Sequence, residues 1–383
     1  MDTPLKRILY VGGFELPDKN AAAQRVLGNA KALRALGYEV VFLDVSKEIK
    51  GDTLSAPHET GGFLTYSQRH STSIGGLLSY CLSPLHVEEV LEKHNGWYAV
   101  IAYNYPALAL SQLRRLCRRR GIRLYGDCTE WHTLVQWSLK FLLIQADMFL
   151  RMIFVQKRLD GVIVISRLLE RHFSRYTKCV ILPPLVDAED GKWKSEGAHR
   201  LSGDRLELVY FGSPGLDKDL LNVVLAVLSK SSQAVRLRIV GISQEQYEAI
   251  YPCDQKRVKS LLEAGKLSFL GRLPHRDALA VVKQADYTIF YRERTRTAMA
   301  GFPTKFVESI SCGVPVITTE TSDLREYSPE NKNAILLPCE SFAERFEELL
   351  DRITTQKFSA PIVEATTFDF RHFIPRLRAF LEN

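Results

Sequence analysis

The sequence lacks the features that mark secreted, membrane-spanning and zinc-binding proteins. Its 383 residues include seven cysteines, but these form no C-x-x-C pair and have no histidine at a zinc-ligand spacing, which disfavours a disulfide framework or a zinc site. No segment contains the roughly 18 consecutive apolar residues of a membrane span, and the opening MDTPLKRILYVGG has no signal-peptide pattern. We therefore expect a cytoplasmic protein with reduced, buried thiols.

Other absences concern cofactors and partners. The sequence has no G-x-G-x-x-G motif, which disfavours a nicotinamide or flavin enzyme. No D-x-D directly follows a predicted strand, and cationic side chains can replace a metal beside a diphosphate, so we expect neither a metal nor a cofactor. No nucleic-acid-binding module is recognisable, so a nucleic-acid partner is not expected.

The chain is long enough for two domains, and its apolar pattern predicts the class of fold. Short apolar runs alternate with amphipathic stretches, which is typical of parallel sheets with right-handed crossovers. The first series of predicted strands comprises residues 7–13, 38–45, 97–103, 122–127 and 161–166. The second series comprises residues 206–213, 235–241, 266–271, 285–292 and 314–319.

A polar segment without periodicity separates the two series. We interpret residues 187–205 as a linker. The prediction is an α/β protein with two doubly wound, Rossmann-like parallel-sheet domains, residues 1–186 and 206–366, that face a cleft where ligands bind at the carboxyl ends of the strands. Residues 367–383 are predicted to form an amphipathic helix that crosses back to the first domain.

One segment of the second domain has a composition suited to a diphosphate. In AGFPTKFVESISCGVPVIT, residues 300–318, a predicted helix begins near Pro303. The free N–H groups of Thr304 and Lys305, with the Lys305 ammonium, would then meet a diphosphate, and Glu308 lies one turn further along. The alternative is a capped helix that only packs under the following strand.

Several segments together resemble the retaining, metal-independent glycosyltransferases of the GT-B fold, which use nucleotide diphosphate sugars and often serve cell-surface polysaccharide synthesis. The resemblance covers nearly the whole chain and implies a hexosyltransferase with a nucleotide-sugar donor and a carbohydrate or lipid-linked carbohydrate acceptor. The segments that carry it are ILYVGGFELPDKNAAAQRVLGNAKALRALGYEV, VIVISRLLERHF, PPLVD, FLGRLPHRDALAVVKQADYTIF and FVESISCGVPVIT.

The resemblance also implies which residues bind the donor. Gly12 and Gly13 would lie over the donor phosphates and the reacting sugar. Glu308 matches the second glutamate of the family's E-x7-E motif, which holds the ribose, and Lys218 matches the lysine of its R-x4-K pair, which neutralises the leaving diphosphate. Arg272 matches the loop beside the base. Lysine and arginine suit this role because the departing diphosphate concentrates negative charge.

Two residues depart from the family pattern. Ala300 stands in place of the first glutamate, and Ser213 stands in place of the arginine. Arg292, at the end of a predicted strand, would replace the missing arginine together with Lys305, or else belong to a solvated loop. The departures leave open a catalytically silent nucleotide-sugar-binding scaffold subunit, and an epimerase of the same fold is a further alternative.

The segment GDCTEWHT, residues 126–133, lies where the resemblance places the acceptor side. His132 would orient the donor or polarise the acceptor hydroxyl, and Asp127 or Glu130 would take its proton. A histidine simply packed beside a tryptophan is the alternative. No protein nucleophile is expected, since the donor phosphate is the usual candidate base in these enzymes.

Basic residues are concentrated in one stretch of the chain. Residues 114–178 contain 14 basic and 5 acidic residues, an excess of +9, whereas the whole chain carries +7. Within this stretch, residues 137–159 are rich in large apolar side chains, and four charged residues fall on one side of a predicted helix. The apolar face belongs either to the core or to a contact of residues 112–159 with an anionic membrane surface, which would make the protein peripheral at the inner face of the membrane. The four charged residues are Lys140, Asp147, Arg151 and Arg158.

Overall fold

The structure is a computed structural model in which the chain divides into two compact units. Unit 1 comprises Met1–Asp187 and Asp369–Asn383, and unit 2 comprises Ala188–Phe368. Part of the predicted linker, residues 195–204, lies outside the described residues. The described residues are 6–17, 19–51, 53–70, 80–132, 139–194, 205–215, 219–330, 332–355 and 358–382, without the side chains of 139–141.

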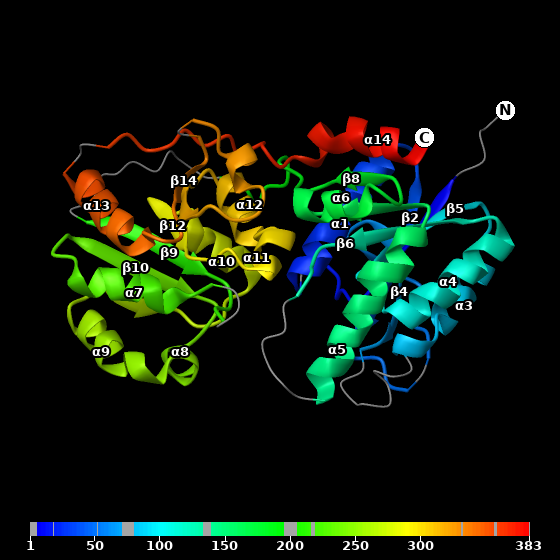
Figure 1. The fold of residues 1–383 in the computed structure, drawn as a ribbon, viewed down its shortest axis with the longest axis horizontal. Coiled ribbons are helices and arrows are strands. Elements are labelled where there is room, and N and C mark those ends of the chain that lie inside the picture. Colours follow the sequence, from blue (N-terminus) through cyan, green and yellow to red (C-terminus); the bar gives the residue numbers. More distant parts are fainter. Residues whose placement is uncertain are drawn as a thin grey trace. The chain divides into compact units, whose positions relative to one another are not determined.

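Unit 1 is built on an eight-stranded sheet in the order β3-β4-β2-β1-β5-β6-β7-β8. Its neighbouring strands are parallel except for the antiparallel pair of β3 and β4. The central strands are continuous apolar runs because helices cover both faces of a parallel sheet (Figure 1). The strands are β1 (Arg7–Gly12), β2 (Glu39–Ser46), β3 (His58–Thr60), β4 (Phe63–Arg69), β5 (Trp97–Tyr103), β6 (Arg123–Cys128), β7 (Gly161–Val164) and β8 (Cys179–Ile181).

The helices of unit 1 come from both of its chain segments. The first begins after Asn20, whose side chain accepts a hydrogen bond from the Ala23 N–H and so caps the helix. The last packs against the strands: a Cβ at Gly161 would lie 2.7 Å from the Phe380 ring, so glycine permits the close approach. The helices are α1 (Ala21–Ala35), α3 (Leu85–Lys93), α4 (Ala107–Arg120), α5 (Leu139–Leu150), α6 (Arg167–Phe173) and α14 (Ile374–Glu382), with short turns η1 (Arg151–Val155), η2 (Gln156–Arg158) and η5 (Phe370–Phe373).

Unit 2 contains a six-stranded parallel sheet in the order β11-β10-β9-β12-β13-β14. The strands are β9 (Leu206–Phe211), β10 (Val235–Val240), β11 (Leu267–Phe269), β12 (Tyr287–Phe290), β13 (Val316–Thr319) and β14 (Ala334–Leu337). The helices are α7 (Leu221–Lys230), α8 (Gln244–Ile250), α9 (Gln255–Glu263), α10 (His275–Val282), α11 (Arg296–Ala300), α12 (Thr304–Ser311) and α13 (Phe342–Thr354), with turns η3 (Pro252–Asp254) and η4 (Leu324–Tyr327). The predicted α/β class with two parallel sheets is confirmed.

Each sheet has one place where the strand order reverses. In unit 1, β2 and then the antiparallel pair β4 and β3 lie on one side of β1, whereas β5, β6, β7 and β8 follow on its other side. In unit 2, β10 and β11 lie on one side of β9, whereas β12, β13 and β14 follow on the other. Open α/β sheets bind ligands outside the carboxyl ends of the strands at such a reversal. The loops after β1, β5, β9 and β12 are therefore the expected positions of a ligand-binding site.

The apolar segment of residues 137–159 differs from the prediction in continuity and in orientation. It consists of α5, a π-helical turn η1 and a 3₁₀ turn η2. Two of its four charged residues face inward, because Asp147 accepts a 2.7 Å hydrogen bond from the Ala107 N–H and Arg151 is buried. Arg158 is exposed, and the side chain of Lys140 lies outside the described residues. Several large apolar side chains are exposed instead, so burial in the core does not account for this face. The exposed ones are Leu142, Leu143, Ile144, Phe149, Leu150 and Phe154.

Candidate functional site

A cluster of charged side chains lies at the strand reversal of unit 2. Tyr210 is on β9, Asp219 is in the loop that follows, Arg292 follows β12, and Lys305 is in the first turn of α12. Asp219 accepts hydrogen bonds from Arg292 Nε at 2.5 Å, from the Tyr210 hydroxyl at 3.1 Å and from Lys305 Nζ. Three segments distant in sequence thus converge on one buried carboxylate.

The cluster is nearly inaccessible to water. Asp219 is 2% exposed and Lys305 is 9% exposed. Burial lowers the pKa of Lys305, and the attraction of Asp219 opposes this effect. Burial alone would raise the pKa of Asp219, but Arg292 and Lys305 outweigh it and hold that pKa well below its usual range. The site therefore contains two cations and one anion, a surplus of positive charge that can receive a phosphate.

A glycine after β9 leaves room for the Lys305 ammonium. Gly212 has φ +117, a conformation that other residues rarely adopt, and a Cβ there would lie 3.2 Å from Lys305 Nζ. The Lys305 ammonium also lies 4.2 Å from the centre of the Tyr210 ring. A side chain at position 212 would thus crowd the buried cation.

Helix α12 carries the other predicted donor-binding residues of this region. Thr304 is its first residue, and Pro303 is the residue that precedes it. Glu308 lies one turn further, and its Oε1 is 3.2 Å from His275 Nε2 at the start of α10. Arg272 lies in the loop before α10 and is exposed. His275 thus joins the candidate residues, although the sequence analysis assigned it no role.

The two positions that depart from the family pattern differ in exposure. Ala300 is fully buried at the end of α11, whereas Ser213 is exposed after β9. Lys218 lies outside the described residues. Arg292 and Lys305 both pair with Asp219, and the role of Arg292 as a replacement for the missing arginine stays a prediction.

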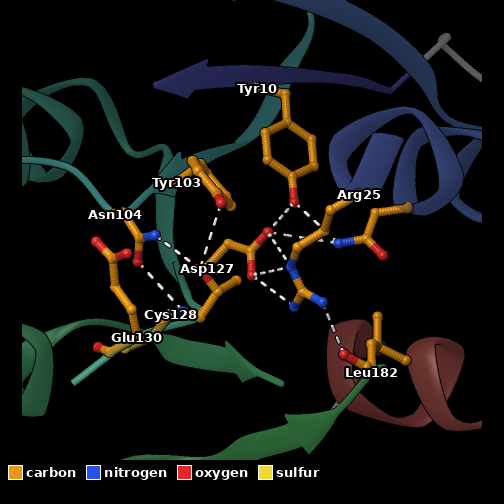
Figure 2. Close-up of polar contacts among 10 residues, drawn as sticks. Tyr10, Arg25, Tyr103, Asn104, Asp127, Cys128, Glu130 and Leu182 are labelled. Carbon is orange, nitrogen blue, oxygen red and sulfur yellow. Dashed lines mark hydrogen bonds and ion pairs between the residues drawn. The ribbon is translucent and has the colours of Figure 1, made fainter. Parts of the chain in front are cut away.

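In unit 1, Asp127 lies within a buried network at the end of β6 (Figure 2). Its carboxylate accepts hydrogen bonds from Arg25 Nη2 at 2.7 Å, from the Tyr10 hydroxyl at 2.5 Å and from Asn29 Nδ2 at 3.5 Å. Arg25 also donates to the Leu182 carbonyl oxygen at 2.8 Å. Asp127 and Asn29 are fully buried and Arg25 is 2% exposed.

These contacts differ from the predicted role of Asp127 as a proton acceptor. A carboxylate that is inaccessible to water and paired with a guanidinium has no access to an acceptor hydroxyl in this structure. We therefore infer a structural role for Asp127, which ties α1 to β6. Sequence reasoning missed Arg25 and Tyr10, since a partner 102 residues away leaves no local signal.

Glu130 and His132 lie close together in the loop after β6. His132 Nε2 is 3.0 Å from Glu130 Oε2, and Arg151 Nη2 is 3.8 Å from Glu130 Oε1. The side chains of His132 and Glu130 are 33% and 37% exposed, whereas that of Arg151 is 4% exposed. The structure thus brings two of the three predicted catalytic residues together, and the buried Arg151 of the π-helical turn contacts one of them, Glu130.

The glycine pair after β1 lies at the strand reversal of unit 1. A Cβ at Gly12 would be 2.7 Å from the carbonyl oxygen of Tyr103, the last residue of β5, so only glycine allows this approach. Gly13 is exposed. Beside them, Asn104 has a positive φ of 41 and donates from Nδ2 to Thr129 Oγ1 at 2.7 Å. The loops after β1, β5 and β6 are therefore joined at one edge of the sheet.

Among the described residues, no group of three or more histidine, cysteine, aspartate or glutamate side chains could hold a metal ion. Within the same part of the chain, every helix is too short or too polar to cross a membrane.

Comparison with solved structures identifies the fold. Sucrose-phosphate synthase from Thermosynechococcus elongatus is 14% identical and has a TM-score of 0.69 over 98% of both chains. Anabaena HepE in complex with UDP is 14% identical, with a TM-score of 0.66 over 98% of this chain and 99% of that one. The lipopolysaccharide outer core galactosyltransferase WaaB is 11% identical, with a TM-score of 0.63 over 98% and 99%. The chain has the GT-B fold.

The sequence comparisons concern unit 2. Residues 192–362 match the sequence model of the family described as glycosyl transferases group 1. This match, which includes the whole cluster around Asp219, confirms the predicted enzyme class of glycosyltransferase. A search of curated proteins finds no significant match to the chain.

Proposed function

We propose that this protein transfers a hexosyl group from a nucleotide diphosphate sugar, with retention of configuration, to a carbohydrate or lipid-linked carbohydrate in cell-surface polysaccharide synthesis. The observation that carries the proposal is a pair of cations, the partly buried Arg292 and the buried Lys305, that Asp219 holds beside the start of α12 at the strand reversal of unit 2. A leaving diphosphate gains most from cations and helix N–H groups held in a site of low dielectric constant.

The donor would use further residues on the same elements. Thr304 would add a backbone N–H to the diphosphate, Glu308 would accept hydrogen bonds from the ribose hydroxyls, and Arg272 and Lys218 would lie near the base and the phosphates. HepE was solved with UDP and with UDP-glucose, which makes UDP the first nucleotide to test. No metal and no cofactor has a part in this proposal.

The acceptor side is proposed to lie in unit 1. His132 is partly exposed and held by Glu130, so it would polarise an acceptor hydroxyl or orient the donor. Gly12 packs closely against Tyr103, and the exposed Gly13 beside it would approach the phosphates and the reacting sugar. The donor phosphate itself would take the acceptor proton, the role that the family resemblance implies for it. WaaB, a galactosyltransferase of the lipopolysaccharide outer core by description, supports a role in cell-surface polysaccharide.

A thermal-shift screen without added metal tests the donor site. We expect UDP or another nucleoside diphosphate to raise the melting temperature, because a ligand that binds only the folded protein stabilises it by mass action. Glu308→Ala should abolish most of the shift, and Glu347→Ala, an exposed glutamate on α13, serves as the matched control. The scaffold alternative predicts binding with no transfer or hydrolysis of the donor. No shift with any nucleotide or sugar conjugate would refute the proposal.

We further propose that unit 1 contacts an anionic membrane surface through α4 and α5. Leu143 is 61% exposed and Phe149 is 57% exposed on α5. Helix α4 packs beside this segment, since Arg114 Nε donates to the Arg158 carbonyl oxygen at 2.7 Å. Exposed apolar side chains next to exposed arginines are typical of a surface that inserts among lipid headgroups. The protein would then work at the inner face of the membrane, where a lipid-linked acceptor is available.

Reversing three exposed arginines of α4 tests this contact. Arg120 already pairs with Glu88 and Glu92, so the informative variant is Arg115, Arg118 and Arg119 to Glu. We expect co-sedimentation with phosphatidylserine vesicles to fall at least tenfold, because each basic residue near the surface contributes about 1 kcal/mol. Lys230, Lys256 and Lys259 to Glu in unit 2 gives the same charge change as a control. If both variants pelleted equally with the vesicles, the α4 arginines would have no specific part in membrane binding.

A further inference from the structure

Asp219 places a negative charge inside the cluster that is proposed to receive a diphosphate. A carboxylate repels phosphate, so its position between Arg292 and Lys305 requires a reason. It belongs to no motif of the sequence analysis. Asp219 occupies some of the hydrogen-bond donors of Arg292 and Lys305 and leaves other donors of both residues for a ligand.

Asp219 holds Arg292 by one edge only. Its Oδ1 accepts from Nε, and among the described residues no hydrogen bond reaches the two terminal amino groups of Arg292. Those two groups form the fork that binds phosphate oxygens in pairs. The carboxylate thus fixes the plane of the guanidinium and leaves its phosphate-binding edge available.

Lys305 is held in a similar way. Its ammonium has three donors, and two of them are directed at Asp219 Oδ2 and at the Tyr210 hydroxyl, which is 3.1 Å away. One donor remains for a ligand. Because Lys305 is 9% exposed, an ammonium without Asp219 would lose the nearest charge that compensates its burial.

The backbone keeps Asp219 in this position. Asp219 and Arg292 form an antiparallel bridge, and the next residue, Leu220, donates from its N–H to the Tyr291 carbonyl oxygen at 3.0 Å. The backbone of Arg292 is fixed in turn by Thr319, whose hydroxyl accepts from the Arg292 N–H at 3.0 Å and donates to its carbonyl oxygen at 2.6 Å. The carboxylate is therefore part of a rigid frame.

We propose that Asp219 is a positioning residue that keeps Arg292 oriented and Lys305 charged before the donor diphosphate binds. The inference rests on the proposed donor site and deepens it. The two cations and one carboxylate leave a surplus of one positive charge, so the cluster attracts a diphosphate although it contains an anion. Asp219 touches the two binding residues and not the substrate.

Removal of the Asp219 charge should make nucleotide binding sensitive to pH. The groups that face Lys305 are Asp219, Arg292, Tyr210 and Glu308. Burial already lowers the pKa of Lys305, and without Asp219 the repulsion from Arg292 lowers this pKa further. A lysine with a lowered pKa is charged below that pKa and loses its proton as the pH rises through it. The Tyr210 hydroxyl stays neutral because burial raises its pKa.

Calorimetric titration with UDP at pH 7.0 and pH 9.0 tests the proposal, since the UDP phosphates stay ionised throughout this range. We expect Asp219→Asn to weaken UDP binding about tenfold at pH 7.0 relative to the unmodified protein, and by a larger factor at pH 9.0. Asp219→Glu keeps the charge, so it should show a smaller loss and no added pH dependence.

A second carboxylate in unit 2 provides the matched control. Asp254 is 7% exposed, accepts from the Tyr247 hydroxyl at 2.7 Å and pairs with Arg257, so three of the four residue types of the cluster recur here in a separate set of contacts. Asp254→Asn should lower the melting temperature without changing the UDP affinity at either pH.

The outcomes separate this inference from the proposed function. If the unmodified protein binds UDP and Asp219→Asn binds it equally or more tightly at both pH values, Asp219 is not a positioning residue. An identical pH dependence of Asp219→Asn and Asp219→Glu would also overturn the inference. If the unmodified protein binds neither UDP nor any other nucleoside diphosphate, the donor site itself is wrong, and the inference fails with it.

Discussion

Replacing Lys305 with alanine is expected to reduce sugar transfer by about 10²–10³-fold, the usual cost of one preorganised group that stabilises developing charge. The ammonium is buried and held by Asp219 and Tyr210, so it is oriented before the charge of the leaving diphosphate develops. Binding of a nucleoside diphosphate should weaken by about 1–3 kcal/mol, the range for a hydrogen bond to a charged group. Steady-state kinetics and calorimetry measure the two effects.

The structure offers a control for the loss of a lysine as such. Lys259 lies exposed on α9 of the same unit, with a side chain that is 77% exposed, and Lys259→Ala should leave both quantities unchanged. Lys305→Ala with full activity and full nucleotide affinity would remove Lys305 from the donor site. A loss of both together with a collapsed melting temperature would instead identify Lys305 as structural.

Replacing Asp127 with asparagine is expected to destabilise unit 1 by about 3–5 kcal/mol, the cost of removing one partner from a buried ion pair. Arginine cannot release its proton in a protein, so the Arg25 guanidinium would remain charged and without its counterion. Urea denaturation in a Trp193→Phe background measures the effect, because the other three of the four tryptophans belong to residues 1–187.

Two further measurements distinguish the structural role of Asp127 from a catalytic one. Tyr10→Phe removes only the hydroxyl, which donates to Asp127 and accepts from Asn29 Nδ2, and should cost about 1–3 kcal/mol, the range that includes a hydrogen bond to a charged group. If Asp127→Asn lost activity while its free energy of unfolding stayed within 1 kcal/mol of the unmodified value, the predicted catalytic role would be restored.

The fold could be predicted well because its strands are buried apolar runs. All ten predicted strands are present, with ends that differ by at most two residues. The strands that escaped prediction have weaker patterns. β8 and β3 have three residues each, too few for a periodicity, and β14 has four. β4, FLTYSQR, mixes polar and apolar residues. Sheet order depends on contacts between distant segments, which no local pattern contains.

The candidate site could be predicted where its residues lie close together along the chain, as Arg292, Lys305 and Glu308 do. Lys305 and Glu308 belong to the start of a single helix, so spacing alone placed them together. Asp219 is 86 residues from Lys305 and 73 from Arg292, and in the sequence it is one more acidic residue in a polar loop. Its importance follows from burial, which the sequence does not reveal. Asp127 is the opposite case. The polar segment after its strand predicted an accessible carboxylate, whereas the structure buries it completely.

Helix α5 shows a limit of patterns based on amphipathicity. The spacing predicted four charged residues on one side of the helix, and two of them, Asp147 and Arg151, face the unit because partners are available there. Asp147 accepts a hydrogen bond from the Ala107 N–H at the start of α4, and Arg151 forms an ion pair with Glu130. These polar contacts turn the apolar side outward, the reverse of the usual arrangement in a globular domain.

The division of unit 1 into two chain segments affects the order in which the two units can fold during translation. Asp369–Asn383 complete this unit, yet a ribosome makes them only after all of unit 2. Leu377 and Leu381 are fully buried, and the Phe380 ring lies 5.0 Å from that of Tyr125, so the first unit has an unfinished surface until translation passes residue 381. Unit 2 can therefore fold first during translation, the reverse of the usual order from the N-terminus.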